Sequence, residues 1–379
     1  MNNIFDYLEW RGDLSFEKDG FNEVDNLIMS VLAYVEFEGI VPLSIDGGSV
    51  SLCYVAEQFK NLYSDISKIS DHQLTQQAFE LFMKAACTVR YRDIKLSYYV
   101  NQINYEQSKQ FSAVVFSINN DQHFIAFRGT DATIVGWKED FQMSFMDEVQ
   151  GQQDAAAYAE KVMAHYDGDF WIGGHSKGGN FAVYAATHTS NEAKGKILGV
   201  YNNDGPGFQA KIIESEGYKS ILNLIKTIIP KFAVVGMLLE HGEEFAVVNS
   251  NAIGIMQHNP FSWDVKGNHF VYEKGLTKSS VKLNRAVRSW LNNLSIEERA
   301  QFVDALFQIL QAAGAKTLFE LSKERSKTID IMIKTFKNMD PVTKQVLKQT
   351  VESLLVESQK TFKPALKPNT KLLFSRKKR

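Results

Sequence analysis

The stretch WIGGHSKGGNFAVYAA, from Trp171 to Ala186, decides the fold. It places one hydroxyl, that of Ser176, between a histidine and a lysine, with glycines on both sides. The run DFWIGGH before the serine is short and apolar, which is typical of a buried strand, and the run KGGNFAVYAATHTS after it is typical of a helix. Two interpretations compete. One is a tight turn at a helix start that packs closely or binds an anion, and the other is a nucleophile held on a strained bend.

The residues around Ser176 fit the pattern G-x-S-x-G, with Gly174 and Gly178 on either side. On a sharp bend from strand to helix the backbone of the serine is strained, and its neighbours two positions away must be small because their backbones pass close together. The bend exposes the hydroxyl at the positive end of a helix, where developing negative charge is stabilised. The pattern alone is weak evidence, but between a strand and a helix it favours a nucleophile.

Strand and helix patterns alternate on both sides of this bend. Short apolar runs separated by turn residues predict strands, and apolar residues at three- and four-residue spacing predict helices. The order is strand, strand, helix, strand, helix, strand and two later strands: residues 111–118, 123–129, 147–166, 169–175, 177–190, 195–204, 244–250 and 268–275. This alternation predicts an α/β fold with a mainly parallel sheet flanked by helices.

Both ends of the chain carry helical patterns. Residues 21–89 are expected to be mainly helical. Beyond about residue 294, Ser295 and Glu298 predict a capping box at a helix start. Apolar residues at helical spacing then give this helix one apolar face: Phe302, Leu306, Ile309 and Ala313. A further helix start is predicted where Asp340 acts as the cap and Pro341 as the first helical residue.

Composition limits the class of protein. The chain has 379 residues, 44% of them hydrophobic and 23% charged, which fits one large globular domain with or without an appendage. The net charge of −2 argues against nucleic acid as a partner. Cys53 and Cys87 are far apart, which fits a reducing compartment. Residues 1–20 lack the basic-then-apolar pattern of a signal peptide, and no apolar run reaches membrane-spanning length, so we expect a cytoplasmic protein. No metal or cofactor motif is present, so we expect neither group.

Two segments resemble a known family. GGHSKGGNFAVYAA is similar to the nucleophile elbow of class 3 lipases, a branch of the α/β-hydrolase fold. IAFRGTDATIVGWKEDF, residues 125–141, resembles the segment that carries the oxyanion-hole residue in those enzymes. More broadly, the first three quarters of the chain resemble a bacterial family of lipase-like serine hydrolases. One departure is Lys177, where an apolar residue is usual, and it affects what we expect of the pocket mouth.

The resemblance implies a reaction and, together with the helical and basic patterns of the C-terminal residues, a domain plan. Residues 1–290 would form the α/β-hydrolase domain, with a helical N-terminal part over residues 1–100. Residues 291–360 would form a helical extension and residues 361–379 a basic tail. The implied reaction is hydrolysis of a carboxylic ester through an acyl-enzyme formed on the serine.

Attack on an ester places negative charge on the carbonyl oxygen, which requires two donors aimed at it in advance. The main-chain amide of Lys177 is one expected donor, because it follows the nucleophile. By its position in the second resembling segment, Thr130 supplies the other, with its hydroxyl as a further aid. Arg128 is expected to brace this loop through a carboxylate, Asp131 or Asp140.

The base is sought among the histidines that follow Ser176, because the chain order in this fold is serine, acid, histidine. His188 lies at the end of the helix after the serine and points away from the bend. His258 lies in a loop after a strand, where catalytic bases commonly occur, and is preferred. His269 and His241 remain alternatives.

The preferred acid is Asp204, which ends the strand that follows the serine's own helix. An aspartate there would lie at the sheet edge where active sites of α/β proteins are found. In class 3 lipases the acid usually follows one strand later, but this chain has Ala233 in the comparable stretch. Glu240, Glu243 and Glu244 remain outside candidates.

The substrate is less visible in the sequence. Residues 208–230 are a mixed polar and apolar stretch that could cap a pocket as a lid. Met237, Leu238 and Leu239 follow and offer either an apolar wall or core packing. Trp137 is expected to be a packing anchor and not a substrate platform. The leading expectation is a lipid ester, a lysophospholipid or another carboxylic ester.

Other classes of function remain open. The fold could serve as a catalytically silent binding or regulatory module, or as a peptidase or thioesterase. The basic tail is expected to be solvated and disordered, with peripheral contact to anionic phospholipid as the alternative. The sequence indicates neither the oligomeric state nor the purpose of the C-terminal helices.

Overall fold

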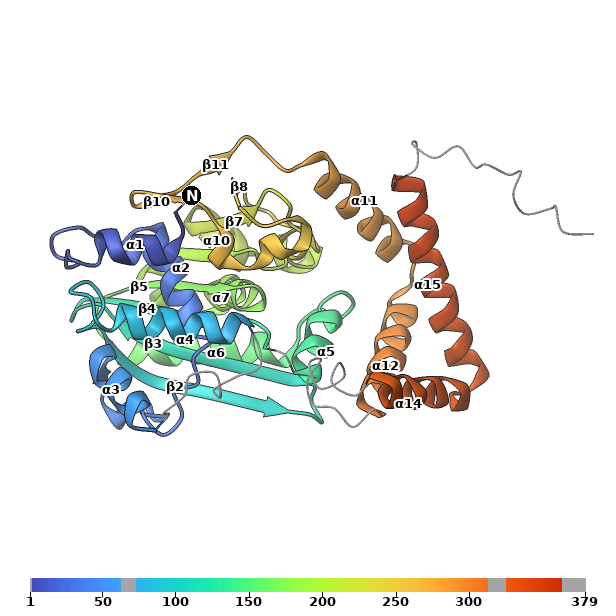
Figure 1. The fold of residues 1–379 in the computed structure, drawn as a ribbon, viewed down its shortest axis with the longest axis horizontal. Coiled ribbons are helices and arrows are strands. Elements are labelled where there is room, and N and C mark those ends of the chain that lie inside the picture. The colour runs from blue at the N-terminus through green and yellow to red at the C-terminus, as the bar shows by residue number, and fades with distance from the viewer. Residues whose placement is uncertain (1, 63–72, 132, 313–324, 363–379) are drawn as a thin grey trace, which may run out of the picture.

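A computed structural model describes residues 2–62, 73–131, 133–312 and 325–362 (Figure 1). Its centre is a nine-stranded sheet in the order β1-β2-β3-β4-β5-β6-β7-β8-β11. Strands β4 to β8 run parallel to their neighbours, whereas the pairs from β1 to β4 and the pair β8–β11 are antiparallel. The predicted α/β fold is therefore confirmed, with the parallel strands in the middle of the sheet.

The strands have the following bounds: β1 Val50–Ser51, β2 Lys95–Asn104, β3 Lys109–Ser117, β4 Gln122–Phe127, β5 Asp169–His175, β6 Ile197–Asn203, β7 Ile225–Pro230, β8 Phe245–Val248 and β11 Tyr272–Glu273. A separate two-stranded ribbon is formed by β9 Val265–Lys266 and β10 His269–Phe270.

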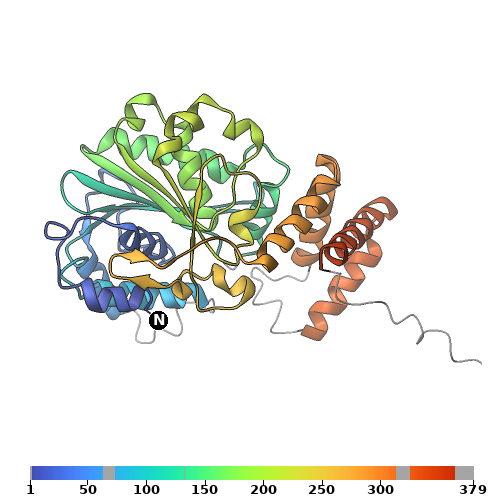
Figure 2. The same cartoon turned by 90° about the horizontal axis from the view of Figure 1, so that it is seen from above.

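Helices cover both faces of the sheet (Figures 1 and 2). Alternate residues of β3 enter opposite cores, because side chains alternate along a strand. Val114 and Phe116 pack with the N-terminal helices, and Ala113 and Val115 pack with α6 and α7. The helices up to the end of the sheet are α1 Ile4–Arg11, α2 Glu23–Leu32, α3 Leu52–Leu62, α4 Gln73–Ala85, α5 Ile134–Gln142, α6 Gln150–His165, α7 Lys177–His188, α8 Asn191–Lys194, α9 Ala210–Ile213 and α10 Glu216–Ile221.

The structure differs from the sequence-based expectations at several elements. Strand β2 was not predicted, and neither was β7. Residues 208–230, which the sequence left open as a lid, form α9, α10 and β7 of the sheet and its crossover. The last predicted strand, residues 268–275, is divided between β10 in the ribbon and β11 in the main sheet.

The C-terminal helices are α11 Lys278–Asn292, α12 Ile296–Ala312, α14 Arg325–Asn338 and α15 Pro341–Phe362. They stand beside the sheet, with α12 packed on α5 (Figure 1). The predicted capping box is confirmed, because the Ser295 amide donates to Glu298 at 2.8 Å and the Glu298 amide donates to the Ser295 hydroxyl at 3.1 Å. The Asp340 cap is also confirmed by a 2.9 Å hydrogen bond from the Thr343 amide.

Two expectations concern residues outside the described part of the chain. Ala313, the last residue of the predicted apolar face, lies there, and so does the basic tail from residue 363 onward. On the described residues of that face, Phe302 and Ile309 are buried as predicted. Within the described ranges, every helix is too short or too polar to cross a membrane.

The junction between β5 and α7 is a turn of one residue. Ser176 is its only residue, with φ of 58° and ψ of −131°. A Cβ atom on Gly174 would lie 2.3 Å from the main-chain carbon of Gly178, and a Cβ atom on Gly178 would lie 2.1 Å from the carbonyl oxygen of Phe127. Both positions therefore exclude any side chain, as the sequence pattern predicts.

We expect Gly178→Ala to lower the free energy of unfolding by about 3 kcal/mol or more, because the added methyl group meets rigid backbone. Urea denaturation measures this change. Gly275→Ala is the control, since a Cβ there has no described heavy atom within 4 Å. Equal stability of the two variants would contradict the close packing of the junction.

Candidate active site

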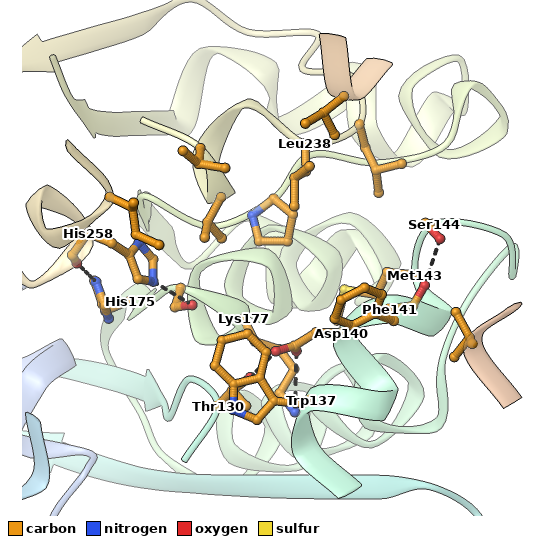
Figure 3. Close-up of a pocket in the computed structure, with 18 of the residues that line it drawn as sticks. Thr130, Trp137, Asp140, Phe141, Met143, Ser144, His175, Lys177, Leu238 and His258 are labelled. Atoms are coloured by element: carbon orange, nitrogen blue, oxygen red, sulfur yellow. Dashed lines mark hydrogen bonds and ion pairs between the residues drawn. The ribbon is translucent and has the colours of Figure 1, made fainter. Parts of the chain in front are cut away.

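Three polar side chains meet at the carboxyl end of the sheet. Figure 3 shows one of them, His258, beside His175. Ser176 lies between β5 and α7, Asp204 directly follows β6, and His258 ends the 3₁₀ turn η5, Gly254–His258. The distance from Ser176 Oγ to His258 Nε2 is 3.0 Å, and that from His258 Nδ1 to Asp204 Oδ2 is 2.6 Å. The structure thus brings together the three residues that the sequence favoured.

The hydrogen bonds set the roles of the two imidazole nitrogens. Because the Asp204 carboxylate accepts a hydrogen bond, Nδ1 of His258 carries the proton and Nε2 is left to accept one from Ser176. The second oxygen of Asp204, Oδ1, accepts from the Gly236 amide at 3.1 Å. Burial raises the pKa of Asp204, and the hydrogen bond from His258 acts in the opposite direction. The arrangement can remove a proton from the serine hydroxyl.

His175 positions the segment that carries His258. Its Nε2 donates to the main-chain oxygen of His258 at 2.8 Å, and its Nδ1 accepts from the Tyr34 hydroxyl at 3.0 Å. Burial, reinforced by neighbouring His258, lowers the pKa of His175 well below its ordinary value, so the ring is neutral. The sequence gave no sign of this contact with the base.

The alternative bases and acids lie elsewhere. His241 faces Glu243, with 3.1 Å between its Nδ1 and the carboxylate. His269 is exposed on β10, and Glu240 forms an ion pair with Arg288. Ala233, in the stretch where class 3 lipases place the acid, is fully buried. Glu244 is exposed and has no described hydrogen bond or ion pair with Ser176, His258 or Asp204.

Thr130 differs in part from the sequence-based expectation. Its hydroxyl donates to Asp140 Oδ2 at 2.6 Å, so the hydrogen points at this carboxylate and not at a substrate oxygen. Burial raises the pKa of Asp140 to about 6, although nearby Lys177 acts in the opposite direction. The Asp140 carboxyl group is therefore mainly ionised at pH 7. While Asp140 is ionised, the Thr130 hydroxyl is therefore not free to donate to a substrate oxygen, and the expectation that it helps there is wrong. The structure leaves its main-chain amide as the candidate donor.

The brace predicted for Arg128 is present. Its Nη2 lies 3.3 Å from Asp131 and donates to the Asn101 side chain at 3.1 Å. Of the two carboxylates expected, Asp131 is therefore the partner. Arg128 is almost fully buried, so it holds the loop in place and does not offer a charge to solvent.

The ammonium group of Lys177 is buried and does not present its charge to solvent. It donates to Glu139 at 2.8 Å and to the Gln110 side chain at 2.9 Å, and the two charged side chains are each 1% exposed. Asp140 lies 3.7 Å from the same ammonium group. The pair joins α7 to α5, and the main-chain amide of Lys177 remains at the start of α7, where helix amides have no partner within the helix.

An apolar pocket of about 570 Å³ opens over Ser176. Its walls come from α5, the loop after β7, η5 and the C-terminal helices α11 and α12. Apolar side chains that line it include Trp137, Phe141, Val235, Leu238, Leu239, Ile255, Met256, Trp290, Leu291, Phe302 and Val303. The hydroxyl of Ser176 thus faces a space of the size that holds small organic ligands.

The pocket also tests three expectations about its wall. Trp137 is 39% exposed and lines the pocket, so its interpretation as a packing anchor is wrong. Leu238 and Leu239 line the pocket, which agrees with the interpretation of this stretch as an apolar wall. Met237 instead packs with Ile229 and its neighbours. No residue from 208 to 230 lines the pocket among those described, and α11 and α12 cover it instead.

Comparison with known proteins gives one family match. The chain matches the model of the Mbeg1-like family over residues 85–308. Among solved structures, it is similar to one titled "Crystal structure of M37 lipase", with 14% sequence identity and a TM-score of 0.32. That alignment covers 50% of this chain and 69% of the other. No curated protein matches the chain.

We expect Lys177→Met to destabilise the fold by about 3 kcal/mol, because it leaves the buried Glu139 carboxylate without its charge partner. The double variant Lys177→Met/Glu139→Gln should lose less than the sum of the two single changes. A double-mutant cycle from urea denaturation measures the coupling. Additive losses would show that the two groups do not stabilise each other.

Proposed function

This chain belongs to the Mbeg1-like family, and we propose that it is a serine hydrolase that cleaves carboxylic esters. The observation that carries the proposal is the pair of hydrogen bonds that joins Ser176 to His258 and His258 to Asp204, at 3.0 and 2.6 Å. This is the constellation of a nucleophile, a base and an orienting acid, which is recognised by geometry and not by sequence position.

The proposed reaction has two halves. Ser176 Oγ attacks the ester carbonyl carbon while His258 Nε2 takes its proton, and the ester's C–O bond then breaks as His258 returns that proton to the leaving alcohol. Water next attacks the acyl-enzyme, His258 again accepts the proton, and the acid leaves as Ser176 recovers its hydrogen. Asp204 stays ionised and stabilises the imidazolium that forms in each half.

The negative charge of each tetrahedral intermediate needs main-chain donors. The amide of Lys177 suits this role because it is the first of α7, where the helix dipole also favours negative charge. The Thr130 amide is the proposed second donor. The Lys177–Glu139 pair would hold the first donor in place by anchoring α7 to α5.

The pocket favours an ester with an apolar acyl group. Its wall over Ser176 consists mainly of aliphatic and aromatic side chains, such as Leu238, Trp290 and Phe302. Burying an acyl chain against them is favourable, at about 0.8 kcal/mol for each methylene group. We therefore propose lipid esters, including lysophospholipids, as the substrate class. Hydrolysis rates on p-nitrophenyl esters of graded chain length, compared with peptides and thioesters, would separate an esterase from a peptidase or thioesterase.

We expect Ser176→Ala to abolish ester hydrolysis and labelling by a fluorophosphonate probe, because no other group replaces the attacking oxygen. Its melting temperature should stay nearly unchanged. Ser220→Ala, on the exposed face of α10, is the control and should keep both activities. Undiminished hydrolysis by Ser176→Ala would end this mechanism, and a wild-type chain that neither reacts nor labels would favour a silent binding module.

We expect His258→Ala to lower kcat on p-nitrophenyl esters by about 10³-fold or more, because the serine then has no base. His269→Ala, a change on the exposed side of β10, should leave kcat within about twofold, since it touches no group of the proposed triad. Steady-state kinetics on both variants decides the point. The reverse pattern would move the base to His269.

A further inference from the structure

In the described part of the chain, most charged side chains that line the pocket have an opposite charge nearby, and one does not. Asp131 lies beside Arg128, Asp140 lies within 4 Å of Lys177, and Lys177 is paired with Glu139. Arg299, on α12, has no carboxylate within 4 Å among the residues that the structure describes. It is therefore the one strong charge on the described pocket wall that has no opposite charge beside it.

The main chain holds the guanidinium of Arg299 in a fixed orientation. Its Nε and Nη2 donate to the carbonyl of Leu291 at 3.1 and 2.6 Å, and its Nη1 donates to the carbonyl of Ser144 at 2.7 Å. A guanidinium has five N–H donors, so one donor on each Nη atom remains. Burial lowers the pKa of Arg299, yet an arginine keeps its charge in proteins.

This cation lies away from the reacting groups. Ser144, whose carbonyl accepts from Arg299, is at the end of the pocket opposite His258 (Figure 3). The pocket wall also contains apolar residues of α11, of α12 and of the link between them: Trp290, Phe302 and Leu294. A partly dehydrated, oriented guanidinium in such a wall is a strong site for a carboxylate or phosphate group.

We propose that Arg299 binds an anionic group of the substrate, so that the preferred ester carries a phosphate or carboxylate several bonds from its scissile carbonyl. The inference rests on the proposed ester hydrolysis at Ser176 and narrows its substrate class. Ser176 and His258 would act on the ester at one end of the pocket while Arg299 fixes the charged end of the same molecule. The C-terminal helices would then determine specificity.

The competing role for Arg299 is purely structural, because its three hydrogen bonds also fasten α12 to the end of α11 and to the turn after α5. Arg288 offers a matched control for such fastening. It donates to the Leu239 carbonyl at 2.8 Å and pairs with Glu240, but it does not line the pocket. A loss that follows from weakened helix docking should appear in both variants and with every substrate.

Hydrolysis of matched esters below their micellar concentrations tests the proposal. One pair is 1-lauroylglycerol 3-phosphate and uncharged 1-lauroylglycerol, which places the anion on the alcohol side. The other is mono-p-nitrophenyl dodecanedioate and p-nitrophenyl laurate, which places it at the end of the acyl chain. We expect the wild type to prefer the anionic member of one pair, and Arg299→Gln to lower kcat/KM for it about 10- to 100-fold.

The same variant should change kcat/KM for the uncharged esters by less than about threefold. Arg299→Lys should keep part of the preference, because lysine keeps the positive charge but lacks the paired N–H donors of a guanidinium. Arg288→Gln should leave the preference intact. The pair that shows the preference identifies the side of the ester that faces Arg299. Equal losses on charged and uncharged esters, or no preference in either pair, would overturn the proposal.

A binding measurement separates this inference from the proposed reaction. Trp137 and Trp290 line the pocket, so their fluorescence reports occupancy. In Ser176→Ala, 1-lauroylglycerol 3-phosphate should bind more tightly than 1-lauroylglycerol, and adding Arg299→Gln should remove the difference. This result without any wild-type hydrolysis would refute the ester reaction and keep the anion site, whereas equal binding of the two ligands would refute the anion site.

Discussion

The hydrogen bond from the Ser176 amide to the Asn203 carbonyl, at 2.9 Å, fixes the bend on which the site depends. A serine with φ of 58° is strained, and such a residue persists only where its surroundings determine it fully. Asn203 does this through its side chain as well, which donates to the carbonyl of Gly174 at 3.0 Å and to Asn26 at 3.2 Å. Because β5 and β6 are parallel neighbours, the same contacts place Asp204 next to the bend.

The base reaches the serine through a second set of fixed contacts. Phe232 and Trp263 both donate at 2.9 Å to Gln257, the residue before His258, one to its side chain and the other to its carbonyl. His175 holds the carbonyl of His258 itself. Three segments far apart in the sequence thus meet around one imidazole, which keeps it oriented without a bound substrate. Such preorganisation is what a proton transfer requires.

The sequence predicted the features that depend on local patterns and missed those that depend on packing between distant segments. The bend at Ser176 was readable because G-x-S-x-G stood between a strand and a helix, and Asp204 followed from strand order. The pairing of Lys177 with Glu139 and the closure of the pocket by α11 and α12 left no local signal, since an amphipathic helix does not reveal what it covers. Strand β7 was missed because residues 208–230 mix polar and apolar positions without a clear period.

The most direct measurement is a crystal structure of the protein after reaction with an alkyl phosphonate. The account predicts a bond between phosphorus and Ser176 Oγ, a phosphonyl oxygen within hydrogen-bond distance of the Lys177 and Thr130 amides, and His258 Nε2 beside the adduct. Phosphorus attached to another residue, or an adduct whose oxygen faces neither amide, would contradict it.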